Sequence, residues 1–425
     1  MPQPRLDPAP RQYPPFVALL RRAARGPAAA PARTTADEIE AWLLREAIRE
    51  DDMLPLYESL VWRLAAAGLP LDRSSVHVGT LHPQLLGFAW NWNRADGLCD
   101  EVKVGDLARQ SDSYRRNPLY RANVYGESMR CDLSDPDTLA RFPLMAELAA
   151  QGITDYIVLA LGGGAYHNAV TIATQQTGGF SDAERATLER IFALFALHIE
   201  RHIAQRIAGN VLDTYLGTAA GGKVLRGSIH RGSGEPIRAV IWVSDLRGFT
   251  DLADRLEGAD MIALLNAYFE RLAGAVLAHD GEVLKFIGDG LLAVFPFAAF
   301  GDEAQAAAAS LAAAEAAMAA VDRLNAEPPP DLARIAGWQP LRSGIALHEG
   351  DVFFGNVGAE ARLDFTVIGR AVNAASRVES LTKTLGRSIL ITEPVARRLD
   401  RPLDPLGAHA LRGLAEPVPL FGLHR

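Results

Sequence analysis

The stretch that most constrains the fold is a pair of apolar runs separated by a short glycine turn. Val283–Ile287 and Leu291–Phe295 flank Gly288-Asp289-Gly290. Apolar runs of strand length on either side of an Asp-Gly pair are a strong signal for a β-hairpin. The simplest interpretation is a core hairpin in which Asp289 is only a turn residue. However, Lys285 is a cation within the first run, and an ammonium group is costly to bury without a partner. We therefore predict that Lys285 faces a cleft that holds one.

Length and composition are those of an ordinary globular chain. Its 425 residues suffice for two or three domains, and 49% of them are hydrophobic and 22% charged. The net charge of −8 gives no reason to expect a nucleic-acid partner or an anionic membrane surface. Cys99 and Cys131 form neither a disulfide framework nor a metal-binding spacing. No uninterrupted apolar run is long enough to span a bilayer, so we expect a cytoplasmic protein without a membrane partner.

Composition and periodicity divide the chain into four parts. Residues 1–34 are rich in proline, alanine and arginine, which predicts a disordered tail. Residues 35–205 show the helix and strand patterns of a mixed α/β domain. Residues 206–236 contain several glycines and read as a linker, and residues 237–425 form the output domain. Five aromatic residues of the first domain could line a ligand pocket or belong to its core: Trp90, Trp92, Tyr114, Tyr120 and Tyr125.

A long helix is predicted to connect the first domain to the linker. It opens with the capping box Ser181-Asp-Ala-Glu184. Four apolar residues recur at heptad-like spacing and favour a parallel two-stranded seam: Leu188, Phe192, Phe195 and Ile199. His198 and His202 are four apart and could share a metal ion, although no third ligand lies nearby in the sequence. The order of helix, strands and capped helix resembles that of GAF-type sensory domains, and a domain that only dimerises is the alternative.

The output domain places further polar residues next to apolar strands. Asp245 follows the apolar strand Ile237–Val243 and precedes a glycine turn and a short helix. Carboxylates at strand ends suit Mg²⁺, and backbone amides at such turns suit anions. Together with Asp289, Asp245 would supply two carboxylates for a pair of metal ions, as in phosphoryl-transfer sites. Asn373 and Arg377 are four apart and share one face of a predicted helix, which could also be a merely solvated face.

Three motifs in this order resemble those of class III nucleotidyl cyclases. They are Val243-Ser-Asp245-Leu-Arg-Gly248-Phe-Thr250, Lys285-Phe-Ile-Gly-Asp289 and Thr366-Val-Ile-Gly369-Arg-Ala-Val-Asn373-Ala-Ala-Ser-Arg377. Val243 stands where the family usually has Phe. The resemblance covers about residues 237–425 and implies a ferredoxin-like fold and a homodimer with active sites at its interface. The expected fold class is thus α/β (α+β), with a GAF-like α/β sensory domain and a linker helix before the class III cyclase domain.

The resemblance also implies roles for individual residues. Asp245 and Asp289 would hold two Mg²⁺, which Mn²⁺ can replace, with the carbonyl of Leu246 as a further ligand. Amides of Arg247–Thr250 would bind the β- and γ-phosphates, which assigns Gly248, Phe249 and Thr250 to the substrate. Asn373 would orient the ribose, Arg377 would stabilise charge on the α-phosphoryl group, and Arg412 would contact the triphosphate.

The base would be read by Lys285 and Thr366. In the family, Lys with Asp or Thr accompanies adenine, and Glu with Cys accompanies guanine. Adenine offers an acceptor at N1 and a donor at N6, which an ammonium donor and a hydroxyl acceptor complement. Guanine offers donors at N1 and N2, which Lys285 would oppose.

The sequence therefore predicts an adenylate cyclase that converts ATP to cyclic AMP and pyrophosphate. An unidentified small molecule or protein would regulate it through the N-terminal domain. The alternatives are a guanylate cyclase and a cyclase-like module that only dimerises or binds nucleotide. Asp245, Asp289, Asn373 and Arg377 are all present, which opposes the second alternative.

Overall fold

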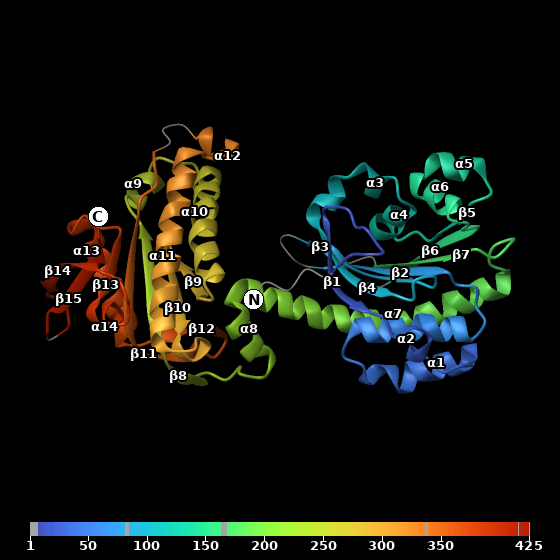
Figure 1. Ribbon diagram of the computed structural model, residues 1–425, viewed down its shortest axis with the longest axis horizontal. Coiled ribbons are helices and arrows are strands. Elements are labelled where there is room, and N and C mark those ends of the chain that lie inside the picture. The colour runs from blue at the N-terminus through green and yellow to red at the C-terminus, as the bar shows by residue number, and fades with distance from the viewer. Residues whose placement is uncertain (1–6, 81–84, 163–167, 336–338, 415, 425) are drawn as a thin grey trace. The chain divides into compact units, whose positions relative to one another are not determined.

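The computed structural model describes residues 7–80, 85–162, 168–335, 339–414 and 416–424. The chain divides into two compact units, Met1–Val211 and Leu212–Arg425. Each unit has its own sheet and its own helices (Figure 1). The predicted mixed α/β class is confirmed.

The N-terminal unit is built on a seven-stranded sheet. Its strand order is β1-β4-β3-β2-β7-β6-β5, and every neighbouring pair is antiparallel. The strands are β1 (Val17–Ala23), β2 (Arg73–Gly79), β3 (Leu85–Asn93), β4 (Cys99–Gly105), β5 (Met129–Asp132), β6 (Asp155–Leu161) and β7 (Asn168–Thr174). Antiparallel sheets commonly pack at least one face against a core.

Helices cover both faces of this sheet (Figure 1). One face carries α1 (Ala36–Arg45), α2 (Met53–Ala66) and α7 (Asp182–Leu216). The other carries α4 (Pro118–Tyr125), α5 (Pro136–Arg141) and α6 (Pro143–Ala150), with the short α3 (Asp112–Arg115) beside them. Trp90 and Trp92 lie in the core on the α2–α7 side, whereas Tyr114, Tyr120 and Tyr125 stack edge-to-face on one another. The GAF-like nature of this unit stays a prediction.

The N-terminal tail differs from the expected disorder. Val17–Ala23 forms the edge strand β1, which pairs with β4. Arg22 pairs with Asp100, a carboxylate without exposed side-chain surface, and Tyr13 donates a hydrogen bond to the same carboxylate at 2.6 Å. The prediction of a disordered tail over residues 1–34 is therefore wrong for this strand. Its composition was misleading because the arginines are held by buried acids of the sheet.

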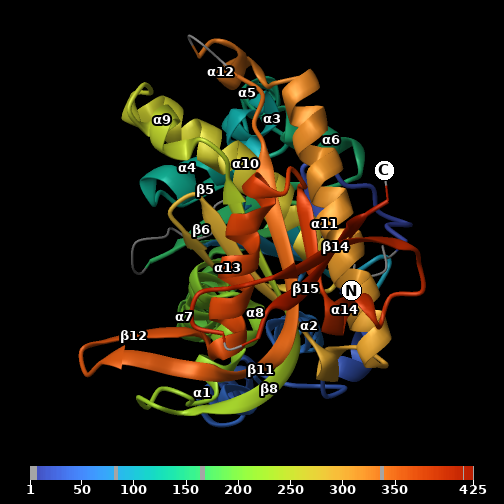
Figure 2. The same cartoon turned by 90° about the vertical axis from the view of Figure 1, so that its left-hand side faces the viewer.

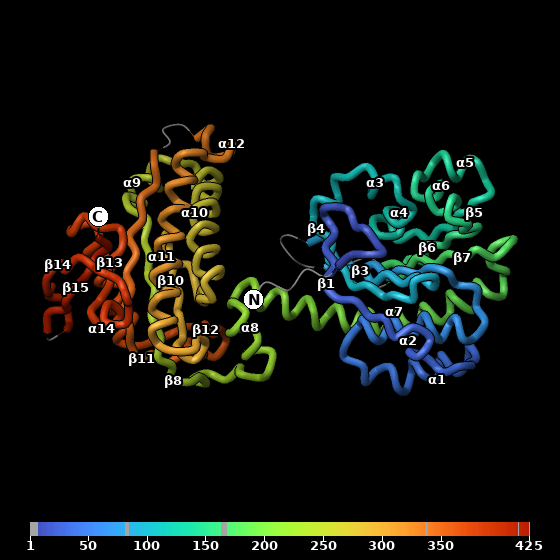
Figure 3. The backbone as a smooth tube through the Cα atoms, in the orientation of Figure 1, coloured from blue at the N-terminus to red at the C-terminus, as the bar shows by residue number. Residues whose placement is uncertain are grey.

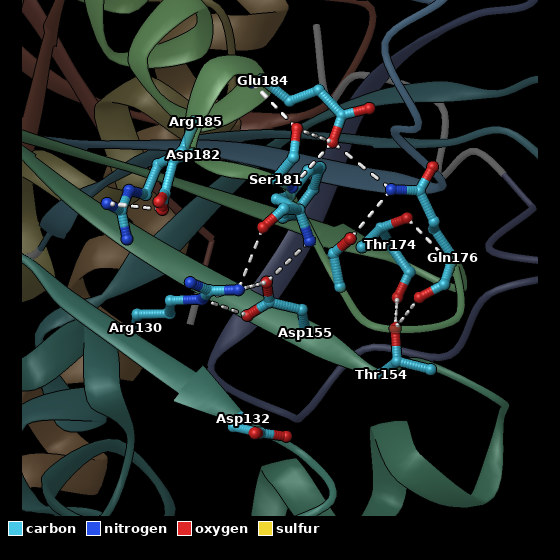
Figure 4. A network of polar contacts seen from close by, with 12 residues as sticks. Arg130, Asp132, Thr154, Asp155, Thr174, Gln176, Ser181, Asp182, Glu184 and Arg185 are labelled. Carbon is cyan, nitrogen blue, oxygen red and sulfur yellow. Dashed lines mark hydrogen bonds and ion pairs between the residues drawn. The ribbon is translucent and has the colours of Figure 1, made fainter.

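The predicted capping box of α7 is confirmed. Ser181 N–H donates to Oε2 of Glu184 at 2.8 Å, and Glu184 N–H donates to Oγ of Ser181 at 3.3 Å (Figure 4). Next to it, Arg130 bonds Asp155 and the carbonyl of Phe180. The start of the helix is thus fixed to the sheet by polar contacts.

The heptad-like residues of α7 do not form a seam. Leu188, Phe192, Phe195 and Ile199 are at most 1% exposed and pack in the core of their own unit. The predicted parallel seam is wrong because these side chains cover the sheet and α2. His198 is buried as well, and its Nε2 lies 2.9 Å from the carbonyl oxygen of Leu43. It therefore serves a structural contact and not the metal pair considered with His202.

The linker is more helical than the glycines suggested. α7 continues to Leu216, and α8 (Thr218–Leu225) follows directly. Strand β8 (Gly234–Leu246) begins within the range predicted as linker. Helix formation tolerates Gly209 here because the single glycine lies inside a helix of 35 residues.

The C-terminal unit is built on an eight-stranded sheet. The order is β14-β15-β13-β11-β8-β10-β9, and β12 pairs with β11. The strands after β8 are β9 (Glu282–Ile287), β10 (Gly290–Pro296), β11 (Ser343–Ala359), β12 (Arg362–Ile368), β13 (Ile389–Thr392), β14 (Leu403–His409) and β15 (Val418–Leu423). Figure 2 shows β11 and β12 as one long hairpin.

The core of this unit has the ferredoxin-like arrangement. The chain runs β8, α10 (Gly258–Ala278), β9, β10, α11 (Glu303–Ala326) and β11, a path that can be followed in Figure 3. In sequence order these four strands lie as 4-1-3-2 across the sheet. This is the β-α-β-β-α-β pattern of ferredoxin-like folds, so the predicted topology is confirmed.

Helices also cover both faces of the second sheet. α10 and α11 pack on one face, and α13 (Arg370–Thr384) packs on the other. The short helices are α9 (Phe249–Ala253), α12 (Pro330–Ala333) and α14 (Glu393–Ala396). α10 and α11 are long and apolar enough to cross a membrane by length and composition alone. Both contribute a buried stripe to the core of this unit, as core helices do.

Candidate active site

The opening hairpin forms as predicted. β9 and β10 pair with Gly290 opposite Ile287, and Asp289 lies in the turn between them. Gly288 has a φ of +62°, a conformation that favours glycine. A Cβ atom on Gly290 would lie 2.8 Å from the carbonyl oxygen of Ser244, so the neighbouring strand leaves no room for a side chain. The two glycines therefore fix the place of Asp289.

Asp245 and Asp289 come together at the same edge of the sheet. β8 and β10 are neighbours with Leu291 opposite Ser244, which brings the turn beside the end of β8. Partial burial and then the charge of Asp289 raise the pKa of Asp245 to about 6. The carboxyl groups interact directly, because a hydrogen bond with Asp289 also raises this pKa. Two carboxylates that repel each other in this way form a site that a divalent cation would stabilise.

A third acid lies behind this pair and was missed from the sequence. Glu379 of α13 is 8% exposed, and its pKa is raised to about 7, first by burial and then by the charge of Asp245. Gly344 of β11 lies opposite Asp245, and a Cβ atom there would be 2.5 Å from Oε1 of Glu379. The residue follows Arg377 by two positions, and an acid on the inner side of an amphipathic helix is the signal that could have revealed it.

The turn after β8 agrees only in part with the predicted phosphate cradle. Gly248 has a φ of +77° and precedes α9, so Phe249 and Thr250 begin the helix. However, the amide of Arg247 already donates to the carbonyl of Arg342 at 2.8 Å. The predicted use of the Arg247 amide for a phosphate is therefore contradicted. Leu246 is 2% exposed, and its amide bonds the Asp245 carboxylate, which lowers the pKa of that group against the larger opposing effects.

Lys285 has the partner that its position required. Its Nζ lies 2.7 Å from Oδ2 of Asp364 on β12. Thr366 lies two residues further along the same strand and is 5% exposed. Its hydroxyl oxygen is buried without a hydrogen-bond partner among the described residues. An unpartnered buried hydroxyl is uncommon and suggests a ligand or water in that place.

Asn373 and Arg377 lie on one face of α13, as predicted. Asn373 is exposed and Arg377 is half-buried. A Cβ atom on Gly413 would lie 3.4 Å from a guanidinium nitrogen of Arg377, so this side chain runs along the turn that also carries Arg412. Arg412 itself is exposed. The structure thus brings Arg377 close to the Arg412 turn.

Polar contacts between the described residues of one chain do not join all of these side chains. Within the described ranges, no hydrogen bond or ion pair joins Asp245 or Asp289 to Lys285, Asn373 or Arg377. Glu379 of α13 lies close enough to the acids for their charges to interact, whereas Lys285 pairs with Asp364. Within the described residues of one chain, the acids and Lys285 therefore have no shared polar contact.

Comparison with known proteins concerns this second unit. Residues 236–417 match the sequence model of the adenylate and guanylate cyclase catalytic domain. An adenylate cyclase of Anabaena cylindrica is 37% identical over 175 residues, which cover 41% of this chain and 33% of the relative. Adenylate cyclase 1 of Rhizobium meliloti (strain 1021) is 29% identical over 180 residues, covering 42% of this chain and 26% of the relative. The matched region thus spans about a third or less of these relatives.

Solved cyclase structures are also similar to this chain. The adenylyl cyclase CyaB from P. aeruginosa is 28% identical and covers 45% of this chain and 96% of its own, with a TM-score of 0.41. The guanylyl cyclase Cya2 is 27% identical and covers 44% and 92%, with a TM-score of 0.38.

The match to the family, the three motifs and the observed topology all concern the C-terminal unit. Residues 236–417 are thus similar to the catalytic domain of adenylate and guanylate cyclases.

Proposed function

We propose that this protein is an adenylate cyclase that converts ATP to 3′,5′-cyclic AMP and pyrophosphate. The observation that carries the proposal is the pair Asp245 and Asp289, held at adjacent strand ends in a domain that is similar to the cyclase family. A guanylate cyclase is the alternative within this family.

The two acids fit a divalent metal site. Burial and then the charge of Asp289 raise the pKa of Asp245, and a bound cation would remove the repulsion between the two acids. Asp245 and Asp289 would hold two Mg²⁺ or Mn²⁺ ions, together with the carbonyl of Leu246. When bound, such ions neutralise phosphate charge and lower the pKa of the ribose 3′-hydroxyl group.

The remaining residues bind and orient ATP. The amides of Gly248, Phe249 and Thr250 face the phosphates at the start of α9, where backbone N–H groups are free of helix partners. Arg412 adds a cation for the triphosphate. Lys285 donates to N1 of adenine, and the unpartnered hydroxyl of Thr366 accepts from N6.

The chemical step is an in-line displacement on the α-phosphorus. The 3′-hydroxyl group releases its proton to solvent, its oxygen forms the new bond to phosphorus, the bond from phosphorus to the bridging oxygen breaks, and pyrophosphate leaves with that electron pair. Asn373 holds the ribose so that the 3′-oxygen is aligned. Arg377 stabilises the negative charge that develops on the α-phosphoryl oxygens, an interaction that is strongest in the transition state.

A homodimer is supported by the lack of a polar contact, within the described residues of one chain, between the two acids and Lys285, Asn373 or Arg377. Asp245 and Asp289 of one subunit would meet Lys285, Asn373 and Arg377 of another, so that each interface completes a site. The N-terminal unit would receive a small-molecule or protein effector and transmit its state through α7. We expect the protein in the cytoplasm, which supplies ATP and keeps Cys99 and Cys131 reduced.

The test is product analysis with the purified full chain. We expect cyclic AMP and pyrophosphate in equal amounts from ATP with Mg²⁺ or Mn²⁺, and much slower cyclic GMP formation from GTP. Preferred use of GTP would replace the proposal by the guanylate cyclase alternative. Nucleotide binding without any cyclic product would instead identify a non-catalytic module.

A further inference from the structure

We propose that the N-terminal unit binds an uncharged, planar aromatic molecule with a carbonyl acceptor, in a pocket between its sheet and α7. The pocket has a volume of about 480 Å³, which lies in the range of small-molecule sites. The bound molecule would be the effector expected at this unit, and in that respect the inference rests on the proposed function. Binding itself can be measured without cyclase activity.

The pocket lies on the face of the sheet that carries α2 and α7 (Figure 1). Val78 of β2 and Phe88 of β3 line it from the sheet. Met53 of α2 and Ile203 of α7 line it from the helices. All four residues are buried and belong to the apolar core of this face. Most of the wall is therefore apolar, as in small-molecule sites.

Charged side chains also line the pocket, and their charges are matched. Arg21 and Arg206 both form ion pairs with Glu101, whose side chain is fully buried. Arg21 also pairs with Asp52, another lining residue. The remaining acid, Asp51, has an 88% exposed side chain and is hydrated. An ionised molecule would have to give up its hydration without gaining an unpaired charge among these side chains, so an uncharged molecule fits better.

Arg206 supplies hydrogen-bond donors at this pocket. Its guanidinium carbon lies 4.2 Å from the ring centre of Phe88 and 5.8 Å from that of Trp90. Nη2 of Arg206 donates to Oε1 of Glu101 at 2.7 Å, and this is its hydrogen bond among the described residues. A guanidinium group has five N–H donors, so most of them stay available. A carbonyl oxygen at the edge of a bound molecule would accept from them.

The aromatic residues of the pocket favour a planar occupant. Phe88 and Trp90 are two positions apart on β3 and therefore point to the same face of the sheet. Flat aromatic molecules pack well on such rings. The indole N–H group of Trp90 is buried without a hydrogen-bond partner among the described residues, which adds a second unused donor. Burial lowers the pKa of His202, another lining residue, so its imidazole adds no charge at neutral pH.

A bound molecule would contact α7 directly. Five of the lining residues belong to this helix, and all of them lie between Ile199 and Arg206. The N-terminal unit ends at Val211, a few residues further on, and the helix continues to Leu216. The molecule would thus hold the last part of α7 within this unit against β3. This contact is the route by which an effector would change the state of the helix.

The experiment titrates the full-length protein with N-phenyl-1-naphthylamine, an uncharged aromatic probe whose fluorescence increases in an apolar site. Excitation of tryptophan reports by energy transfer that the probe lies near Trp90. We expect saturable binding of one probe molecule per chain. 2-Acetonaphthone should displace the probe about tenfold more tightly than 2-ethylnaphthalene, which has the same shape without the carbonyl oxygen, because one hydrogen bond to a charged donor is lost. The anion 2-naphthoate should displace it more weakly than the ketone.

Variants of α7 test the place of binding. Arg206→Met removes the donors and should abolish the preference for the ketone. The matched control is Arg190→Met, which removes an arginine that pairs with Glu40 on the same helix outside the pocket and should keep the preference. Ile203→Phe fills part of the pocket and should weaken probe binding about tenfold or more, as overpacking does. Thermal unfolding checks each fold, and Arg206→Met decides the matter if Ile203→Phe does not fold.

Three results would overturn the binding site. They are no saturable probe binding by the folded wild type, equal displacement by the ketone and the hydrocarbon, and a ketone preference that survives in Arg206→Met. Tighter displacement by 2-naphthoate would contradict the uncharged occupant. Ketone binding that leaves the rate of cyclic AMP formation unchanged would refute the effector role. A wild type that binds the ketone but forms no cyclic product would refute the proposed function alone, because the binding measurements do not depend on it.

Discussion

The carboxyl groups of Asp245 and Asp289 interact directly, although one ends β8 and the other lies in the turn between β9 and β10. Partial burial and then the charge of Asp289 raise the pKa of Asp245 to about 6. Repulsion between the two acids disfavours their charged forms, and a bound divalent cation would relieve it.

Asp289→Ala should abolish turnover and leave the fold intact. The turn conformation depends on Gly288 and Gly290, so the loss of the carboxylate would remove only the proposed metal ligand. Turnover is measured as cyclic AMP formation at saturating Mg²⁺ and Mn²⁺. Circular dichroism is the control for folding. Full activity in this variant would remove Asp289 from the metal site.

Asp245 should make the stability of the metal-free protein depend on pH. Its pKa is higher in the folded protein than the ordinary value of 3.8, so the folded state binds the proton more tightly. The stabilising contribution is present below pH 3.8 and is lost as pH rises to about 6. Relative to Asp245→Asn, the wild type should therefore lose stability across this window and change little above it.

Urea unfolding in the presence of a chelator, at a series of pH values, tests that sign. The free energy of unfolding of the wild type should fall relative to that of Asp245→Asn between pH 4 and pH 6. At neutral pH, Mg²⁺ should reverse this loss of stability only in the wild type. A difference that does not vary with pH would contradict the interaction between the two acids.

Arg377→Ala should lower kcat by on the order of 10²-fold with little change in KM for ATP, as expected for a contact made in the transition state. Steady-state kinetics of the variant beside Arg401→Ala, which removes an exposed arginine paired with Glu315, provides the comparison. A higher KM with an unchanged kcat would make Arg377 a ground-state binding residue.

Exchanging the base-reading pair should shift the preference for the base. Lys285→Glu with Thr366→Cys replaces a donor by an acceptor beside N1, so ATP use should weaken and some GTP use should appear. The ratio of kcat/KM for ATP and GTP measures the shift. An unchanged ratio would mean that other residues read the purine.

The local features of the site could be predicted from the sequence, because they depend on neighbouring residues. The glycines around Asp289 and the period of the apolar runs determine the hairpin. The position of Lys285 within an apolar strand predicted a partner for its ammonium group, and this prediction is confirmed. Its identity could not be predicted, because Asp364 approaches from a strand that lies far away in the sequence and is not paired with β9.

Long-range burial explains the other differences. Phe192 and Phe195 have the spacing of a seam between two helices, but the same spacing also suits a helix that covers a sheet. The composition around residues 17–23 predicted disorder. However, these residues pair with the edge of β4, and Arg22 forms an ion pair with Asp100. The predicted phosphate contact of the Arg247 amide was wrong because this amide donates to the carbonyl of Arg342, which lies far away in the sequence.

In the proposed homodimer, groups from two chains would complete each active site. The direct test mixes the inactive variants Asp289→Ala and Arg377→Ala and lets their subunits exchange. A mixed dimer collects both lesions in one site and leaves the other site intact. Random pairing makes about half of the dimers mixed, so cyclic AMP formation should recover to about a quarter of the wild-type rate. Each variant alone should stay inactive at any concentration, and demonstrated exchange without recovery would contradict a shared site.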